Sequence, residues 1–271
     1  MTGSAPQSAP PLAPRLTPQF AHYLDLVTAL TIKEIKVRYK RTYLGYAWSL
    51  LNPLVYALTY WIAFKAILNV RIEGYFVFLL AGLFPWQWLN NSLTGAPNAF
   101  ITNAPLVKKI AFPRYLIVAS SVVTEGLHFL LSLPVLALLA VLSGRGTVSA
   151  AWLWGAPLLL AIQGVAIYGF ALAIASLNVF FRDLERLLGL AMTVLFFVTP
   201  VIYEPQMVPP LFQPLIAFNP FTHIIVAWRS LLLNGTLDWH AAGAAALVAL
   251  LAVVVGQAIF HRLQWKFAEA L

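Results

Sequence analysis

The stretch TIKEIKVRYKRTYLGYAWSLLNPLVYALTYWIA, from Thr31 to Ala63, decides the fold of this chain. Its apolar run begins at Tyr43 and is long enough to cross a bilayer, because a crossing helix needs about 20 apolar residues. A basic segment that leads directly into such a run is typical of a helix at a membrane boundary. The cations that stand before the run are Lys33, Lys36, Arg38, Lys40 and Arg41.

The composition predicts an integral membrane protein. Hydrophobic residues make up 61% of the chain and charged residues 10%, and the mean hydropathy is +0.82. A water-soluble domain carries about 25% charged residues, so this chain has too little polar surface to cover a soluble globule. The apolar runs are continuous and lack the alternation of a membrane barrel, which predicts an all-α fold. The chain has no cysteine, which excludes a disulfide framework and a cysteine-ligated metal.

The order of segments predicts three regions. Residues 1–19 are rich in Pro, Ala and Ser and predict a disordered cytoplasmic tail. Residues 20–41 predict an amphipathic helix in the membrane interface, with a plain charged flank that only fixes orientation as the alternative. Residues 42–271 predict a membrane domain with six transmembrane helices. These spans are expected at about 43–68, 75–93, 116–142, 152–179, 190–203 and 241–260.

A Pro-rich region lies between the last two predicted spans. Residues 204–234 carry five prolines in 204–220, and the apolar stretch that follows is too short to cross a bilayer comfortably. This pattern predicts external re-entrant or interfacial helices.

The distribution of Lys and Arg predicts the orientation. With six spans, 13 of the 17 cations fall on one side, which the positive-inside rule assigns to the cytoplasm together with both termini. The four cations of the other side are Lys65, Arg71, Arg145 and Arg229.

Enzyme motifs are missing from the sequence. There is no G-x-x-x-x-G-K-[ST] loop, no H-E-x-x-H and no G-x-S-x-G, so no catalytic residue or metal site is predicted. Asp183 and Glu185 stand beside Arg182 and Arg186, where local ion pairing explains them better than acid–base chemistry. Energy for any active process must therefore come from a partner.

Two loops on the predicted cytoplasmic side are short and amphipathic. They are LVKKIAFPRY, residues 106–115, and FFRDLERLLG, residues 180–189. Such elements suit docking into a groove of a cytoplasmic partner. Snorkelling cations that anchor helix ends are an equally good explanation.

Glu125 and His128 lie three residues apart inside the third predicted span and so face one side of a helix. A charge at mid-bilayer depth costs about 2.5–3.5 kcal/mol on insertion scales and is usually functional or paired. The pair predicts either a proton relay or substrate contact, or a Glu–His hydrogen bond that locks two helices together. The second interpretation is favoured, because a proton-coupled transporter would offer further sites.

The first predicted span is rich in aromatic residues. Tyr56 and Tyr60 are four residues apart, and Tyr46 and Trp48 stand near the start of the span. They fit an aromatic belt at the membrane interface. They also fit the wall of a path, because aromatic faces stack on sugar rings.

Several segments together resemble one family. They are RYKRTYLGYAWSLLNPL (38–54), GLFPWQW (82–88), NAPLVKKIAFPR (103–114), LNVFFRDLERLLG (177–189), TPVIYE (199–204) and FNP (218–220). In this order they resemble the permease subunit of ABC transporters that export polysaccharide, of the O-antigen exporter type, with capsule and teichoic acid exporters as relatives. The resemblance covers nearly the whole chain after the tail.

The resemblance implies a homodimer that works with two copies of a separate ATPase, in the bacterial inner membrane. ATP and Mg²⁺ would bind to that ATPase, and this chain would bind no cofactor. The substrate would be a polysaccharide on undecaprenyl diphosphate. The first and fifth spans would line the channel, with Phe196 and Phe197 joining the aromatic residues of the first span. Residues of the loop that docks on the ATPase would be Lys108, Lys109, Ile110, Phe112 and Arg114, and the conduit's cytoplasmic end would carry Arg182, Asp183, Glu185 and Arg186.

The basic stretch gains a role from this resemblance. A diphosphate headgroup at the cytoplasmic leaflet is an anion, and the cations from Lys33 to Arg41 form a cationic surface at that depth. Arg38 and Arg41 are suited to bidentate binding of a phosphate, whereas Lys acts as a point charge. Two alternatives remain: a membrane-embedded transferase acting on a polyprenyl-phosphate-linked glycan, and a related exporter of drugs or small lipids.

Overall fold

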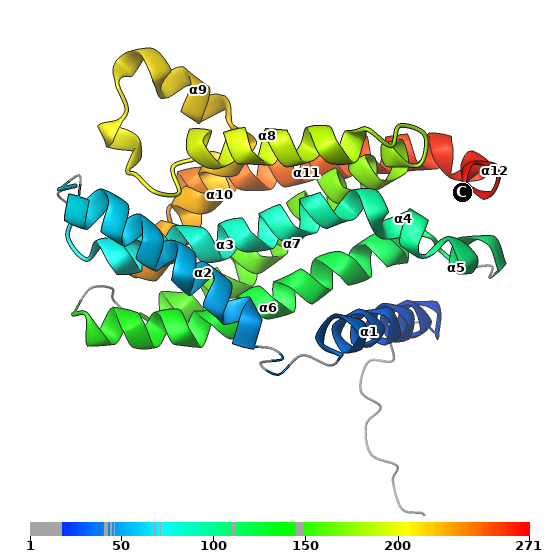
Figure 1. The fold of residues 1–271 in the computed structure, drawn as a ribbon, viewed down its shortest axis with the longest axis horizontal. Coiled ribbons are helices and arrows are strands. Elements are labelled where there is room, and N and C mark those ends of the chain that lie inside the picture. The colour runs from blue at the N-terminus through cyan, green and yellow to red at the C-terminus, as the bar shows by residue number, and fades with distance from the viewer. Residues whose placement is uncertain are drawn as a thin grey trace, which may run out of the picture.

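The computed structural model describes residues 18–40, 43, 45, 47–67, 69–70, 72–109, 112–144 and 149–271. Helices are the only regular elements in this part of the chain, as an all-α fold predicts, and most of them run along the long axis of the molecule (Figure 1). The predicted disordered tail lies almost entirely outside the described residues.

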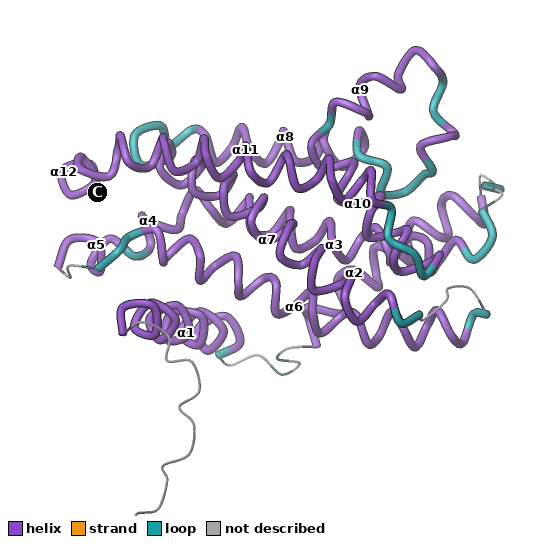
Figure 2. Tube along the Cα trace, turned by 180° about the vertical axis from the view of Figure 1, so that it is seen from behind, coloured by secondary structure: helices purple, strands orange, loops and turns teal. Residues whose placement is uncertain are grey.

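Helix α1 (Pro18–Tyr39) lies across the bundle beside α6, as both views show (Figures 1 and 2). Proline is favourable at a first helical position because the missing N–H has no partner there. The side that packs on α6 includes Thr31, which is 5% exposed, whereas Val37 is 67% exposed.

The first membrane segment consists of α2 (Ala47–Tyr60) and a π-helical continuation (Trp61–Ile67). After a turn at Gly74, α3 (Tyr75–Gly95) runs back along it and continues through a 3₁₀ turn (Ala96–Asn98) into the short helices α4 (Ala99–Thr102) and α5 (Ala104–Lys109). Two long helices follow, α6 (Tyr115–Leu142) and α7 (Ala151–Asn178).

Helix α8 (Leu184–Val198) starts six residues earlier and ends five residues earlier than the fifth predicted span. It ends because Pro200 follows Thr199, and the residue before a proline is forced into an extended conformation, here φ −84° and ψ 136°. The chain then forms two 3₁₀ turns (Pro205–Met207 and Pro210–Phe212), α9 (Gln213–Phe218), α10 (Pro220–Arg229) and a π-helical turn (Ser230–Asn234).

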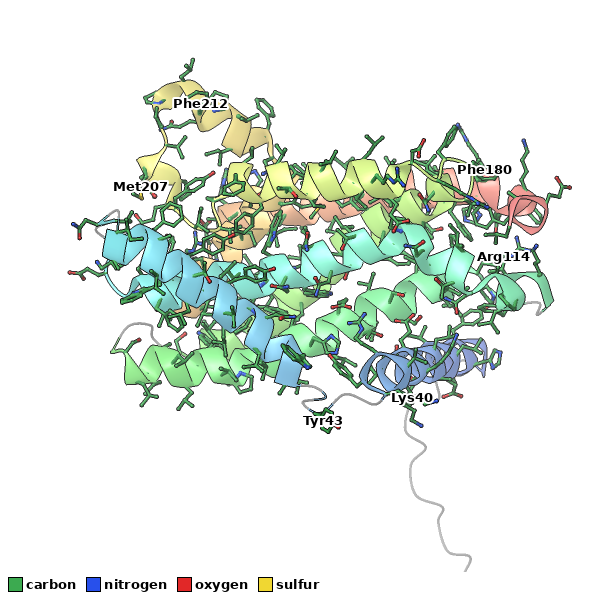
Figure 3. All side chains as sticks on the ribbon, in the orientation of Figure 1. Lys40, Tyr43, Arg114, Phe180, Met207 and Phe212 are labelled. Carbon is green, nitrogen blue, oxygen red and sulfur yellow. The ribbon has the colours of Figure 1, made fainter. Side chains whose placement is uncertain are left out.

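The chain closes with α11 (Trp239–Leu263), a 3₁₀ turn (Gln264–Lys266) and α12 (Phe267–Ala270). Figure 3 shows Met207 and Phe212 at one end of the molecule and Arg114 and Phe180 at the other. The Pro-rich region and the two amphipathic loops therefore lie at opposite ends of the bundle.

Four helical segments of the described chain are long and apolar enough to cross a membrane, namely 50–67, 115–142, 151–178 and 239–266. A fifth is reached if the helices Pro210–Phe218 and Pro220–Asn234, which meet at 93°, are counted as one broken span. Helix α8 has 15 residues, fewer than the about 20 that a crossing needs. Six spans and a re-entrant pair remain predictions.

Helices α7 and α11 approach so closely that a side chain would not fit between them. A Cβ on Gly256 would lie 2.2 Å from the carbonyl oxygen of Gly169, and one on Gly169 would lie 2.4 Å from the backbone of Ala252. Helices in membranes associate through such small residues because lipid offers no hydrophobic driving force.

Arg229 fastens the end of α8 to α10. Its guanidinium is buried, donates hydrogen bonds of 2.8 Å to the carbonyls of Pro200 and Val201, and lies 3.8 Å from the centre of the Phe78 ring. The carbonyls left without helical partners after α8 are satisfied in this way.

Candidate functional site

A ladder of polar side chains joins α1 to α6. The Glu34 carboxylate accepts hydrogen bonds from the hydroxyls of Ser121 at 2.8 Å and Thr124 at 3.1 Å. Beside it, the Thr31 hydroxyl donates to the backbone carbonyl of Ser120 at 3.5 Å. We call this contact the α1–α6 seam. These polar contacts lie beside apolar ones, since Leu30 of α1 packs against the hydrophobic core.

The seam ends in a charged cluster. Arg38 forms an ion pair with Glu125, the Tyr39 hydroxyl lies 3.0 Å from His128 Nε2, and Asn91 of α3 donates to Glu125 at 3.2 Å. The Glu125 side chain is only 6% exposed, whereas that of Arg38 is 44% exposed. Burial lowers the pKa of Arg38, but the attraction and hydrogen bond of the Glu125 carboxylate, together with the smaller effects of Tyr39 and Glu34, leave the pKa above its usual value.

Glu125 and His128 therefore act as a lock between helices, which is the interpretation that the sequence favoured, but with different partners. Their own closest approach is 3.6 Å within α6, and the links to other helices are made by Arg38, Tyr39 and Asn91. A charge at this depth is stabilised because it is paired on two sides.

Three cavities lie along α3. The seam cavity, of about 250 Å³, is lined by Arg38, Trp48, Asn52, Gln87, Asn91 and Glu125, among others. The aromatic groove, of about 450 Å³, is lined by Tyr56, Tyr60, Gln87, Asn90, Phe196 and Phe197, among others. The basal cavity, of about 370 Å³, is lined by Lys33, Glu34, Arg38, Asn91, Asn98 and Asn103, among others.

Four of the aromatic residues predicted to line a path share the aromatic groove. Tyr56 and Tyr60 reach it from α2, and Phe196 and Phe197 from α8. The rings of Tyr60 and Phe196 stack with centroids 5.5 Å apart. Trp48 is not among them, because it lines the seam cavity instead. Tyr46 lies outside the described residues.

The predicted headgroup cations differ in their surroundings. Lys33 donates to the side-chain oxygen of Asn103 at 2.8 Å, so its charge is solvated by an amide and not neutralised. Lys36 and Lys40 are exposed and contact no partner in the described chain, and Figure 3 shows Lys40 at the end of α1. Arg38 is the exception, because Glu125 neutralises it. Arg41 lies outside the described residues.

The loop after α5 lies beside the C-terminal end of the chain. Arg114 donates to the backbone carbonyl of Gln264, and Phe112 packs against the hydrophobic core. Lys108 is exposed at the end of α5, which also contains the backbone of Lys109. Ile110 lies outside the described residues.

The ion pairing expected between α7 and α8 is wrong. Among the described residues, no salt bridge joins Arg182, Asp183, Glu185 and Arg186, which are all exposed. Glu185 instead accepts a hydrogen bond of 2.9 Å from Asn98, which ties the start of α8 to the 3₁₀ turn that follows α3. No acidic cluster forms here, so no observation favours the transferase alternative.

The sequence reasoning missed the amides along α3 and the hydroxyls of α6. Gln87, Asn91 and Asn98 recur at spacings of four and seven, and Ser121, Thr124 and His128 at three and four. Such spacings put polar residues on one side of a helix. The signal was therefore present in the pattern.

The several helices that are long and apolar enough to cross a membrane define a multi-pass membrane protein. The chain matches the ABC-2 type transporter family over residues 25–233 and belongs to that family. It is 42% and 41% identical to two O-antigen export system permease proteins RfbA of Klebsiella pneumoniae, over 92% of this chain and 96% of each relative. A Myxococcus xanthus protein of the same name is 28% identical over 95% of this chain and 99% of the relative.

Proposed function

We propose that this chain is the channel subunit of an exporter that moves O-antigen polysaccharide on undecaprenyl diphosphate across the bacterial inner membrane. The observation that carries this proposal is the aromatic groove, where Tyr56, Tyr60, Phe196 and Phe197 converge between two helices. Aromatic rings offer sugar rings flat apolar faces. Relatives up to 42% identical are named as O-antigen export permeases, which supports the choice of substrate.

The exporter is a homodimer with two copies of a cytoplasmic ATPase, which carries ATP and Mg²⁺, while this chain binds no cofactor. The dimer is supported by the outer face of α8, where Leu187, Leu190 and Val194 are each more than 60% exposed. This face adjoins the aromatic groove, so a second copy would close the groove into a conduit. The ATPase docks at the end of the bundle that carries α5, on the side of both termini.

Lipid capture begins at α1. Lys33, Lys36 and Lys40 attract the diphosphate by charge alone, and Arg38 adds bidentate contacts only by exchanging its Glu125 partner for a phosphate. Arg41 would extend this surface. An anionic headgroup must therefore bind Arg38 more strongly than Glu125 does before α1 can separate from α6.

The test is deletion of the gene in its native bacterium, followed by measurement of surface and intracellular O-antigen. The expected result is loss of surface polymer with lipid-linked polymer accumulating inside, and recovery on return of the intact chain. Unchanged surface polymer with no internal accumulation would refute the proposal. Co-purification of an ATPase with the tagged chain tests the predicted partner separately.

A further inference from the structure

The seam cavity contains amides that have no hydrogen-bond partner in the described part of the chain. Asn52 of α2 and Gln87 of α3 line it, and neither side chain makes a hydrogen bond within the described chain. Asn91 uses its amide nitrogen on Glu125, which leaves its oxygen free. Each free amide offers two donors and an acceptor, so the cavity holds unused hydrogen-bonding capacity of both kinds.

An aromatic ring stands beside these amides. Trp48 is 47% exposed and stacks on no ring of the described chain. Trp88 lines the same cavity but is occupied, because its indole N–H donates to the Val122 carbonyl at 3.0 Å and its ring stacks on Phe129. The Trp48 ring is therefore available to stack on a ligand.

The charges of the cavity are balanced. Arg38 and Glu125 neutralise one another, so a free anion gains little here unless it displaces the carboxylate. A neutral group with several hydroxyls matches the free amides better, since it both donates and accepts. The volume of about 250 Å³ lies below the range of about 300–1,000 Å³ for drug-sized ligands and suits one sugar ring rather than a length of polymer.

The position of the cavity suits the end of a lipid-linked chain. It shares Arg38, Asn91 and Glu125 with the basal cavity, on the side of the α1 cations, and Gln87 with the aromatic groove. A headgroup held by α1 would place the attached sugar between these two neighbours.

We propose that the seam cavity is a saccharide subsite for the sugar ring next to the lipid diphosphate. The ring stacks on Trp48 and is hydrogen-bonded by Asn52, Gln87 and Asn91. The subsite rests on the proposed export of a lipid-linked glycan and adds a requirement for the sugar at the lipid end.

The test compares the full chain in lipid nanodiscs with two probes, undecaprenyl diphosphate alone and the same lipid bearing one sugar, tried as hexose and as N-acetylhexosamine. The intact chain should bind at least one sugar-bearing lipid more tightly than the bare lipid. Asn52→Leu with Gln87→Leu should weaken that binding about tenfold, because each lost hydrogen bond weakens binding several-fold. Binding of the bare lipid should stay unchanged.

The matched control is Gln257→Leu, an amide removed at another membrane-embedded position, where it donates to the Tyr168 hydroxyl. This variant should keep the sugar preference. If the amide variant also keeps it, the subsite is wrong while the proposed function stands. If the intact chain binds neither probe, both fail. If it binds them equally, the subsite alone is overturned.

Trp48→Leu leaves the amides in place and should also lose the preference for the sugar-bearing lipid. If this variant keeps the preference, the stacking role of Trp48 is wrong.

Discussion

Replacing Glu125 by Gln should loosen α1 from α6 by a measurable amount. The substitution keeps the shape of the side chain and its bond from Asn91, but removes the charge that holds Arg38. Hydrogen bonds to charged groups contribute about 1.5–3 kcal/mol, and exposed ion pairs about 0–1 kcal/mol. This pair lies between these cases, because Glu125 is buried and Arg38 is 44% exposed. We therefore expect a loss of about 1–2 kcal/mol.

The readout uses the absence of cysteine in the chain. Thr31, a seam residue away from the charged cluster, is 5% exposed, so a thiol introduced by Thr31→Cys reacts with a maleimide only when α1 leaves α6. The labelling rate then follows the open fraction, and the expected loss corresponds to labelling about 5 to 30 times faster. The control is Glu185→Gln, because the Glu185 carboxylate also accepts a hydrogen bond from an asparagine but lies away from the seam. This variant should leave the labelling rate unchanged.

A second substitution separates the ion pair from other effects. Arg38→Gln added to Glu125→Gln should increase labelling little further, because the two residues act as one pair. Labelling at the original rate in Glu125→Gln would refute the view that this pair holds α1. An equal further increase from Arg38→Gln would show that the two residues act independently.

Three further substitutions test other parts of the structure. Gly256→Ala should force α7 and α11 apart and destabilise the chain by about 1–3 kcal/mol, which would lower the melting temperature. Gly243→Ala should leave the melting temperature unchanged, because a side chain there meets open space. Arg229→Gln removes the donor of two buried carbonyls, at a cost of about 1–3 kcal/mol each. It should therefore lower the melting temperature, whereas Arg262→Gln at an exposed position should not. Equal melting temperatures of the two variants would contradict the view that Arg229 holds the end of α8 to α10. Tyr60→Leu should slow glycan transport into inverted vesicles about three- to tenfold through lost ring stacking, and an unchanged rate would argue against the aromatic groove as the conduit.

Much of the helix pattern could be predicted because hydropathy reports the membrane directly. The predicted spans at 75–93 and 116–142 match α3 and α6 within two residues. The start of α8 could not be predicted in this way, because its first turn carries Glu185 and Arg186. Charged residues lower the hydropathy, so the sequence pattern assigns this turn to the preceding loop. Charged residues are tolerated there because that turn is exposed.

The candidate site was predictable only in part, for a physical reason. Tyr56 and Tyr60 share a helix face by spacing alone, and family resemblance brought Phe196 and Phe197 to the same groove. The partner of Arg38 depends on how α1 lies across α6, and no local pattern fixes contacts between residues 86 or more positions apart along the chain. An arginine predicted as a phosphate ligand was therefore found already paired.

The amides of α3 have a consequence for movement as well as for binding. Gln87, Asn90 and Asn91 recur along one side of α3 with the hydroxyl of Thr94, over about 10 Å at about 1.5 Å per residue, and Asn98 follows in the next 3₁₀ turn. Together they border all three cavities. A neutral amide binds a single sugar hydroxyl weakly, so it can exchange one hydroxyl for the next at a small cost in free energy. In the proposed exporter, a polymer sliding past them would cross many shallow minima instead of one deep trap. This surface would then offer low friction to a chain whose repeating units all look alike.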